Sequence, residues 1–453
     1  MVCNNIESYK WGEATIGLQL SNNYEFMYIN YPNVLVISIE SLSKSTSNGR
    51  TLGNCFYGWP KNKLAQFCLK LNDPDYDLCD NYYCISDLDA LKAFLCFKKA
   101  KRLTYSYNSS YLPNYTSGFQ KNAFRMLLRN VVWKTGVWKT HDFYSWVDNF
   151  MPNVVIIQNA DSPFILDIAR FVANRKRIPL IIYNTEGFSL FKNNWMNKNW
   201  LDFICFPIFK FIYTNSFNKL IKKAQLSIYI NDLLREDYVD KYNKTGIVLY
   251  PSSIIGFNPK LYNDDIPTFS YLGNFGFDRP DALVAIANMI HSISNNYVLD
   301  IYGKATNKQK EMFDSCKSIK YHGLVDYNKV KEVIQDTDFL IHVENQKSCW
   351  EESLKYGFSG KIADCISSGN IFILYASLNI ACSKYILATG AGVVSDNLDI
   401  LKDEIIKIIS SRSYKKIIQI KEKQISQDNH NLLKNSHIFL ESINRVIEKF
   451  MYK

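Results

Sequence analysis

The stretch that decides the fold of this chain is residues 358–375. It reads Phe358-Ser359-Gly360-Lys361-Ile362-Ala363-Asp364, continues to Ser368-Gly369 and ends in the apolar run 371–375. This order predicts a loop, a short helix, a glycine turn and a buried strand. A Ser-Gly pair at a helix start leaves backbone N–H groups that can hold an anion, and Lys361 adds a positive charge there. Asp364 follows three residues later, on the same helix face.

A cation beside free amides suits a diphosphate, and a carboxylate one turn away suits the diol of a ribose. These residue types therefore indicate a site for a nucleotide diphosphate. The alternative is a helix on which Lys361 and Asp364 pair at the surface and bind nothing. The spacing alone favours neither interpretation, because motifs this short often match by chance.

From Tyr271 onward the chain resembles the C-terminal half of a family 4 glycosyltransferase with the GT-B fold. In that family a Ser/Lys loop precedes a helix with an acidic residue, a small-Gly turn and an apolar strand, as in residues 358–375. The family signature has two Glu separated by seven residues, whereas here Tyr356 stands at the first position and Asp364 at the second. Glu344, which follows the apolar run 339–343, is our candidate for the missing carboxylate.

The resemblance implies an α/β protein with two Rossmann-like, doubly wound domains that face a cleft. It also implies a metal-independent, retaining hexosyltransferase that uses a nucleotide-diphosphate sugar as donor substrate and needs no further cofactor. The acceptor would be a glycan or a polyprenyl-phosphate-linked molecule. Heavy use of Asn, Lys, Ile and Tyr is typical of an AT-rich bacterial genome, so we expect a role in surface polysaccharide or glycoconjugate synthesis.

The pattern of apolar runs supports two parallel sheets. Continuous runs alternate with helical segments, which is typical of sheets that are covered on both faces. The runs lie at 34–38, 154–157, 180–183, 226–230, 269–272, 298–302, 339–343 and 371–375. We therefore predict an acceptor-side domain at 1–250, a linker at 251–267, a nucleotide-sugar domain at 268–410 and C-terminal helices at 411–453. The resemblance implies that the last helix packs back on the first domain.

Length and composition fit this organisation. The chain has 453 residues, of which 47% are hydrophobic and 21% are charged, enough for two globular domains. Residues 1–17 contain no apolar core of signal-peptide length, and no apolar run reaches the ~18 residues of a membrane span. The eleven cysteines are scattered and form no Cys-x-x-Cys pair. We therefore expect reduced thiols, a cytoplasmic protein and no zinc site.

Several polar residues follow predicted strands, where open α/β sheets bind ligands. Gly273 and Asn274 follow the run 269–272, and Arg279 comes shortly after. The resemblance implies donor-phosphate contacts from this loop, and a guanidinium binds phosphate through two hydrogen bonds. The alternative is a helix-start arginine paired with Asp281.

A second loop of this kind, containing Asn48 and Gly49, follows the first strand. The resemblance places it beside the donor diphosphate. The alternative is a surface turn, which Asn-Gly pairs form readily.

Two carboxylates follow the next two strands, and we propose them as catalytic candidates with Lys361 and Arg279. Asp161 comes after the run 154–157, and Glu186 comes after the run 180–183. Either could act as a base toward an acceptor hydroxyl or stabilise a cationic sugar. The alternative is a helix N-cap, which suits Asp161 better.

We expect no obligatory metal. Asp-x-Asp patterns at 73–77 and 87–89 resemble a metal signature of another glycosyltransferase fold, but they do not follow an apolar strand. We interpret both as solvated turns. The charge of the donor would then be met by Lys361, Arg279 and helix N-termini.

The charge distribution is uneven. Residues 90–141 contain ten basic residues and no Asp or Glu, which equals the formal excess of +10 of the whole chain. Residues 191–223 contain six Lys, one Asp and nine aromatic residues. Such segments suit an anionic bilayer surface, so we expect peripheral attachment to the inner face of the cytoplasmic membrane. The alternative is a solvated basic face beside a core helix.

Three other functions compete with the transferase. A sugar-nucleotide epimerase would turn over donor without acceptor. A non-catalytic partner subunit would bind a transferase instead of sugars. A basic lipid- or nucleic-acid-binding protein would ignore nucleotides and depend strongly on salt. We predict no nucleic-acid partner, because the basic and aromatic segments are separate and no nucleic-acid motif is present.

Overall fold

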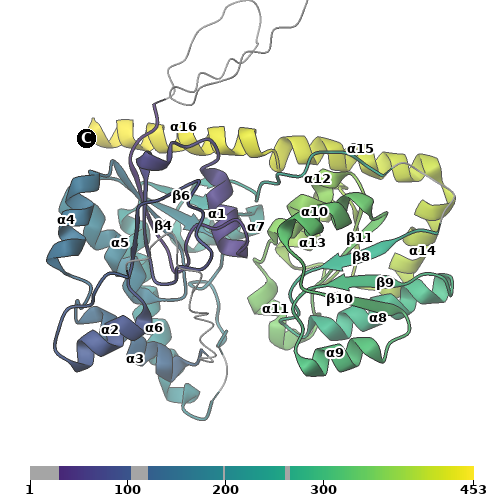
Figure 1. The fold of residues 1–453 in the computed structure, drawn as a ribbon, viewed down its shortest axis with the longest axis horizontal. Coiled ribbons are helices and arrows are strands. Elements are labelled where there is room, and N and C mark those ends of the chain that lie inside the picture. The colour runs from purple at the N-terminus through teal and green to yellow at the C-terminus, as the bar shows by residue number, and fades with distance from the viewer. Residues whose placement is uncertain (1–29, 104–120, 197–198, 261–265, 453) are drawn as a thin grey trace, which may run out of the picture.

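The computed structural model describes residues 30–103, 121–196, 199–260 and 266–452. Two parallel sheets lie side by side, each surrounded by helices (Figure 1). This confirms the predicted α/β fold with two doubly wound domains. The predicted segments 1–250, 90–141, 191–223 and 251–267 each contain residues outside the described ranges.

The first sheet has the strand order β3-β2-β1-β4-β5-β6-β7. Its strands are β1 (Val34–Ile37), β2 (Leu64–Cys68), β3 (Tyr82–Cys84), β4 (Val154–Gln158), β5 (Leu180–Asn184), β6 (Leu226–Tyr229) and β7 (Ile247–Val248). The helices are α1 (Ser47–Cys55), α2 (Asp87–Leu95), α3 (Ala123–Lys134), α4 (His141–Phe150), α5 (Pro163–Lys176), α6 (Asp202–Lys223) and α7 (Asp232–Tyr242). The central strands β1, β4 and β5 are buried along their whole length, as sheets covered on both faces require.

The second sheet has the order β10-β9-β8-β11-β12-β13. Its strands are β8 (Phe269–Leu272), β9 (Leu299–Tyr302), β10 (Ile319–Gly323), β11 (Phe339–Val343), β12 (Ile371–Tyr375) and β13 (Val393–Ser395). Its helices are α8 (Arg279–Ile293), α9 (Asn307–Asp314), α10 (Tyr327–Asp336), α11 (Ser348–Leu354), α12 (Gly360–Ser368), α13 (Ala381–Thr389) and α14 (Leu398–Ser410). The predicted order of loop, short helix, glycine turn and buried strand is confirmed by α12, Gly369 and β12.

Some local predictions were wrong. The residues around Asn48 and Gly49 form the first turn of α1 and not a loop, because the helix already begins at Ser47. Asp87 and Asp89 lie in the first turn of α2, where acidic side chains favour the helix dipole, so 87–89 is not a solvated turn.

The two C-terminal helices connect the domains. Helix α15 (Arg412–Asn429) packs on the second domain, and α16 (Leu432–Met451) continues along the first, as the yellow ribbon in Figure 1 shows. Phe439 of α16 meets Phe56 edge to face, with ring centroids 5.1 Å apart. At the junction of the two helices, the buried His430 hydrogen-bonds through Nδ1 to the carbonyl of Pro251, over 2.8 Å. The segment between the domains is thereby held against the C-terminal helices.

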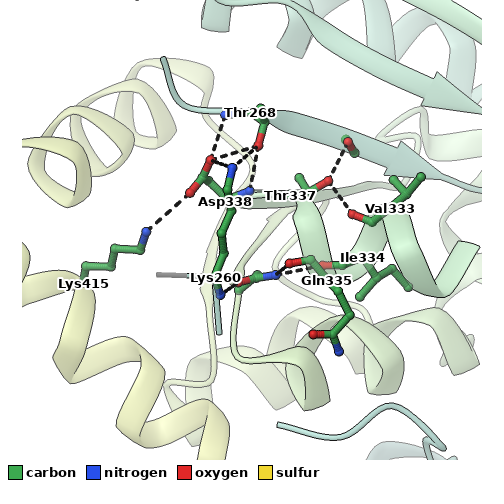
Figure 2. A network of polar contacts seen from close by, with 10 residues as sticks. Lys260, Thr268, Val333, Ile334, Gln335, Thr337, Asp338 and Lys415 are labelled. Carbon is green, nitrogen blue, oxygen red and sulfur yellow. Dashed lines mark hydrogen bonds and ion pairs between the residues drawn. The ribbon is translucent and has the colours of Figure 1, made fainter. Parts of the chain in front are cut away.

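A second anchor of this segment surrounds Asp338 at the start of β11 (Figure 2). Its carboxylate accepts hydrogen bonds from the Lys260 ammonium at 2.8 Å and from the hydroxyl of Thr268 at 2.9 Å. Lys415 of α15 lies 3.8 Å away. Burial opposes ionisation, but these donors hold the pKa of Asp338 below its usual value. One carboxylate thus joins the interdomain segment, the second sheet and α15.

We predict that Asp338→Asn lowers the free energy of unfolding by about 2–3 kcal/mol, because it removes the negative charge that the half-buried ammonium of Lys260 contacts and weakens the hydrogen bonds from Thr268. The shift in the midpoint of urea denaturation, followed by circular dichroism, measures this. Asp336→Asn, at an exposed position two residues earlier, is the matched control and should change little. Equal effects of the two substitutions would contradict the anchoring role.

Candidate active site

A cleft of about 540 Å³ lies between the two domains, at the carboxyl ends of their strands. Polar residues line it from both sides. Among the predicted site residues, the lining contains Asn48, Asp161, Glu186, Asn274, Arg279, Glu344, Phe358 and Ser359. The structure therefore brings together residues that are far apart in sequence, because parallel strands end at one edge of each sheet.

Arg279 and Glu344 form a buried ion pair on the second-domain side. Nε of Arg279 donates to one carboxylate oxygen at 2.9 Å, and Nη2 donates to the other at 2.7 Å. Nη1 bonds the side-chain oxygen of Asn274. His342 also contacts Glu344, at 3.1 Å. Arg279 therefore pairs with Glu344 and not with Asp281, and both oxygens of Glu344 already have protein partners.

Lys361 lies in the first turn of α12, with Ser359 as the N-cap of that helix. No hydrogen bond or ion pair joins its ammonium to another residue in the described part of the chain. Burial lowers the pKa of Lys361, and the nearby charges of Arg50 and Arg279 lower it further. An uncompensated cation between two others is a site that favours an anion.

Asp364 has partners that the sequence did not indicate. It is 1% exposed, and its carboxylate accepts a hydrogen bond of 2.7 Å from the hydroxyl of Ser253. Its second oxygen lies 2.9 Å from Nη1 of Arg50, which comes from α1 of the opposite domain. Asp364 therefore does not pair with Lys361. The only hint of Arg50 in the sequence was its place beside Asn48 and Gly49.

Glu186 and Asp161 lie on the first-domain side and differ in their surroundings. Although burial opposes it, the Lys121 ammonium, 2.8 Å away, holds the pKa of Asp161 below its usual value. The carboxyl group of Glu186 has no hydrogen bond or ion pair with any described residue. Burial and the neighbouring charge of Asp161 raise the pKa of Glu186 to about 7. Such an unpaired, tuned carboxyl group suits proton transfer at neutral pH.

The other predicted residues are not among those that line the cleft; they are Gly49, Gly273, Gly360, Lys361, Ile362 and Asp364. Gly49 is buried, and a side chain there would lie 2.5 Å from the carbonyl oxygen of Ser41, so only glycine fits. Gly273 bonds through its N–H to the carbonyl of Tyr302. Phe358 packs edge to face on Tyr385, and Ile362 is buried in the core.

Tyr356, at the position where the resembling family has its first Glu, joins the two domains. Its hydroxyl donates to Asp237 of α7 at 2.6 Å, and its ring stacks on Phe191. A side chain on Gly187 would lie within 2.4 Å of that ring, so only glycine fits beside Glu186. Tyr356 therefore supplies packing where a carboxylate was expected.

No cluster of three or more His, Cys, Asp or Glu suited to a metal ion occurs in the ranges described above. Within the Asp-x-Asp pattern at 87–89, Asp87 accepts hydrogen bonds from Arg129 and Trp133, at 2.8 and 2.9 Å.

No protein-family model and no curated protein sequence matches this chain. Its fold, however, is the GT-B fold of known glycosyltransferases. Anabaena HepE, solved with UDP and glucose, superposes with a TM-score of 0.58 at 9% identity over 91% of this chain and 99% of that protein. Sucrose-phosphate synthase from Thermosynechococcus elongatus gives 0.60 at 10% identity over 92% and 100%. The lipopolysaccharide outer core galactosyltransferase WaaB gives 0.51 at 13% identity over 92% and 99%.

We predict that Glu186→Gln stabilises the protein at pH 8 but not at pH 5. A carboxyl group whose pKa is raised on folding binds more protons in the folded than in the unfolded chain, so it lowers stability as pH rises from about 4.5 to about 7. The cost at pH 8 is at most about 3 kcal/mol, and Gln avoids it. The difference in melting temperature between variant and wild type, measured at both pH values, tests this.

Asp167→Asn, on a half-exposed acid of α5 that pairs with Arg170, serves as the control. A Glu186→Gln variant that is no more stable than the wild type at pH 8 would show that Glu186 ionises normally.

Proposed function

We propose that this protein is a glycosyltransferase that moves a hexose from a nucleotide-diphosphate donor to an acceptor in the interdomain cleft. The observation that carries this proposal is the uncompensated Lys361 beside Arg279 and Arg50, at the start of α12 and next to the cleft. Cations and helix N-termini at this place suit a diphosphate. The GT-B fold, in which HepE was solved with UDP-glucose, supports UDP as the first nucleotide to test.

In the reaction, the bond between the sugar carbon and the diphosphate breaks, and the acceptor oxygen bonds to that carbon from the same face that the diphosphate leaves, as retention requires. Lys361 and Arg279 stabilise the negative charge that develops on the departing diphosphate. Glu186 takes the proton of the acceptor hydroxyl, for which a pKa of about 7 is suited. No step requires a metal ion or a further cofactor, and we propose retention of the anomeric configuration.

The acceptor side of the cleft is aromatic. Phe188, Phe191 and Trp195 line it. Lys210 of α6 fixes this wall by bonding the carbonyl of Phe188 at 2.8 Å, and Trp195 packs on Phe206 of the same helix. An acceptor that combines sugar rings with a lipid would match such a wall, so we propose a polyprenyl-phosphate-linked or glycan acceptor.

The same helix leads to an exposed apolar surface, which we call the α2–α3–α6 face. Helix α3 packs against both α2 and α6, and each of the three has large apolar side chains exposed along one stripe. They are Leu88, Leu91 and Leu95 on α2, Phe124, Leu128 and Val131 on α3, Trp200 just before α6, and Phe203, Ile204, Ile208 and Phe211 on α6. Basic residues of the segment 90–141 accompany them.

None of the helices in the described part of the chain combines the length and apolar character needed to cross a bilayer. We propose that the α2–α3–α6 face rests on an anionic membrane surface, with the protein in the cytoplasm. Exposed aromatic and aliphatic side chains beside Lys and Arg suit the headgroup region. Phe203 and Phe211, 75% and 73% exposed, would enter it.

One observation favours a second function, that of a non-catalytic partner subunit. Both candidate ribose ligands, Asp364 and Glu344, are already paired with arginines. Such a subunit would bind a transferase and not a nucleotide.

We predict that one nucleotide among UDP, GDP, CMP, dTDP and ADP stabilises the protein, and we expect UDP. At a hundredfold excess over Kd the gain is about 2–3 kcal/mol. Lys361→Ala should abolish it, because the cation that faces the diphosphate is lost. Thermal-shift titration measures both.

Lys434→Ala, on an exposed lysine of α16, is the control and should respond to the nucleotide like the wild type. A well-folded protein that responds to none of the five nucleotides would count against the transferase and for the partner subunit.

We also predict that the protein sediments with anionic phospholipid vesicles and that Phe203→Glu combined with Phe211→Glu reduces this at least tenfold. The substitutions replace apolar area that would enter the headgroup region with charges that the lipids repel. Ile417→Glu combined with Ile420→Glu, on exposed positions of α15, is the matched control. Equal losses in both double variants would refute the specific role of the α2–α3–α6 face.

A further inference from the structure

We infer that Arg50 is a third ligand of the donor diphosphate, held on Asp364 until the donor enters. When it enters, the ribose hydroxyls take the place of Arg50 on Asp364, and the guanidinium turns to the phosphates. This inference rests on the proposed function, and it adds a cation from the first domain to a diphosphate site whose predicted cations, Lys361 and Arg279, both lie in the second domain.

The position of Arg50 carries the argument. It lies in the first turn of α1, and its guanidinium contacts α12 of the second domain, where it pairs with Asp364. Nη2 would lie 3.2 Å from a Cβ atom placed on Gly360, so glycine at this position leaves room for the arginine. The side chain of Arg50 is 15% exposed and lies over the ring of Tyr327 at 5.0 Å. It is therefore held beside the loop that we assign to the diphosphate.

The charges around it are balanced except at one point. Arg279 pairs with Glu344 and Arg50 pairs with Asp364, whereas the ammonium of Lys361 forms no ion pair with any described residue. A diphosphate brings more negative charge than one ammonium can neutralise. Arg50, whose guanidinium lies beside Gly360, is a cation with one replaceable carboxylate partner, whereas Arg279 is held by Asn274 as well as Glu344.

Asp364 can release Arg50 without remaining a bare buried charge. Ser253 already donates to its first oxygen at 2.7 Å, and the two hydroxyls of a ribose can donate to the second. After the exchange, Asp364 has the ribose hydroxyls as partners and Arg50 has the phosphates, so neither charge is left without a partner. Because Arg50 and Lys361 belong to different domains, a donor bound between them would also link the domains.

The test compares UDP with uridine, which has the ribose but no phosphates. We expect Arg50→Gln to weaken UDP binding about ten- to a hundredfold, the effect of losing a charge-assisted hydrogen bond. Uridine binding should be unchanged or tighter, because the ribose no longer displaces a guanidinium. Calorimetry measures UDP, and ligand-observed NMR measures uridine.

Arg235→Gln, which removes a surface arginine paired with Asp232 on α7, is the matched control and should change neither ligand. Arg50→Lys keeps the positive charge but cannot form two parallel hydrogen bonds. It should weaken UDP binding less than Arg50→Gln does and leave uridine binding unchanged. It also serves if Arg50→Gln does not fold, which melting curves will show.

Equal weakening of UDP and uridine would assign Arg50 a structural role and overturn the inference. Unchanged UDP binding in both Arg50 variants would overturn it as well. In either case the proposed function stands as long as the wild type binds UDP. A wild type that binds no nucleotide diphosphate would refute the proposed function, and this inference with it.

Discussion

The ion pair between Arg50 and Asp364 is the constraint on which the arrangement of this site depends. It joins the first turn of a helix in one domain to a buried position of a helix in the other, over 2.9 Å. The same stretch of the second domain supplies further contacts across the cleft. Lys355 and Tyr356 both bond Asp237, and Glu352 accepts from the backbone of Lys192 and Asn193. The segment that contacts the first domain is thus also the segment that we assign to the donor phosphates. The contacts between the domains and the proposed contacts with a nucleotide therefore involve the same part of the chain.

Buried charges in this region are compensated with two exceptions, which lie on opposite sides of the cleft. Glu344, Asp364 and Asp161 each have a cationic partner. Lys361 and Glu186 have none among the described residues. Burial shifts the pKa of both toward the neutral form, downward for Lys361 and upward for Glu186. Such groups lower the stability of the fold unless a ligand supplies the missing charge or hydrogen-bond partner. They therefore identify the reacting centre better than the paired residues do.

The sequence predicted the sheets better than it predicted the partners within the site. Long apolar runs such as β11 and β12 were recognised because they are buried on both faces and read continuously. Short and edge strands were missed, and so was β2, an internal buried strand whose apolar run is interrupted by Gln66. β7 has two residues, and β10 alternates buried and exposed positions at the sheet margin. Candidates at strand ends did meet in the cleft, because parallel topology dictates where strands end.

The pairing of Arg50 with Asp364 could not be predicted from the sequence, because it depends on how far the two domains close on one another. This contact explains why Asp364 is shorter than the Glu of the resembling family. A glutamate would extend its carboxylate one methylene further along the same direction. An aspartate keeps it beside Ser253, where it is 1% exposed and an arginine from the other domain must come to it. Tyr356 completes the exchange, since its ring fills the space beside Gly187 and its hydroxyl bonds Asp237 where a carboxylate would repel that residue. The two departures from the acidic signature therefore act together. Tyr356 replaces a carboxylate and Asp364 shortens one, and each makes a contact that joins the two domains.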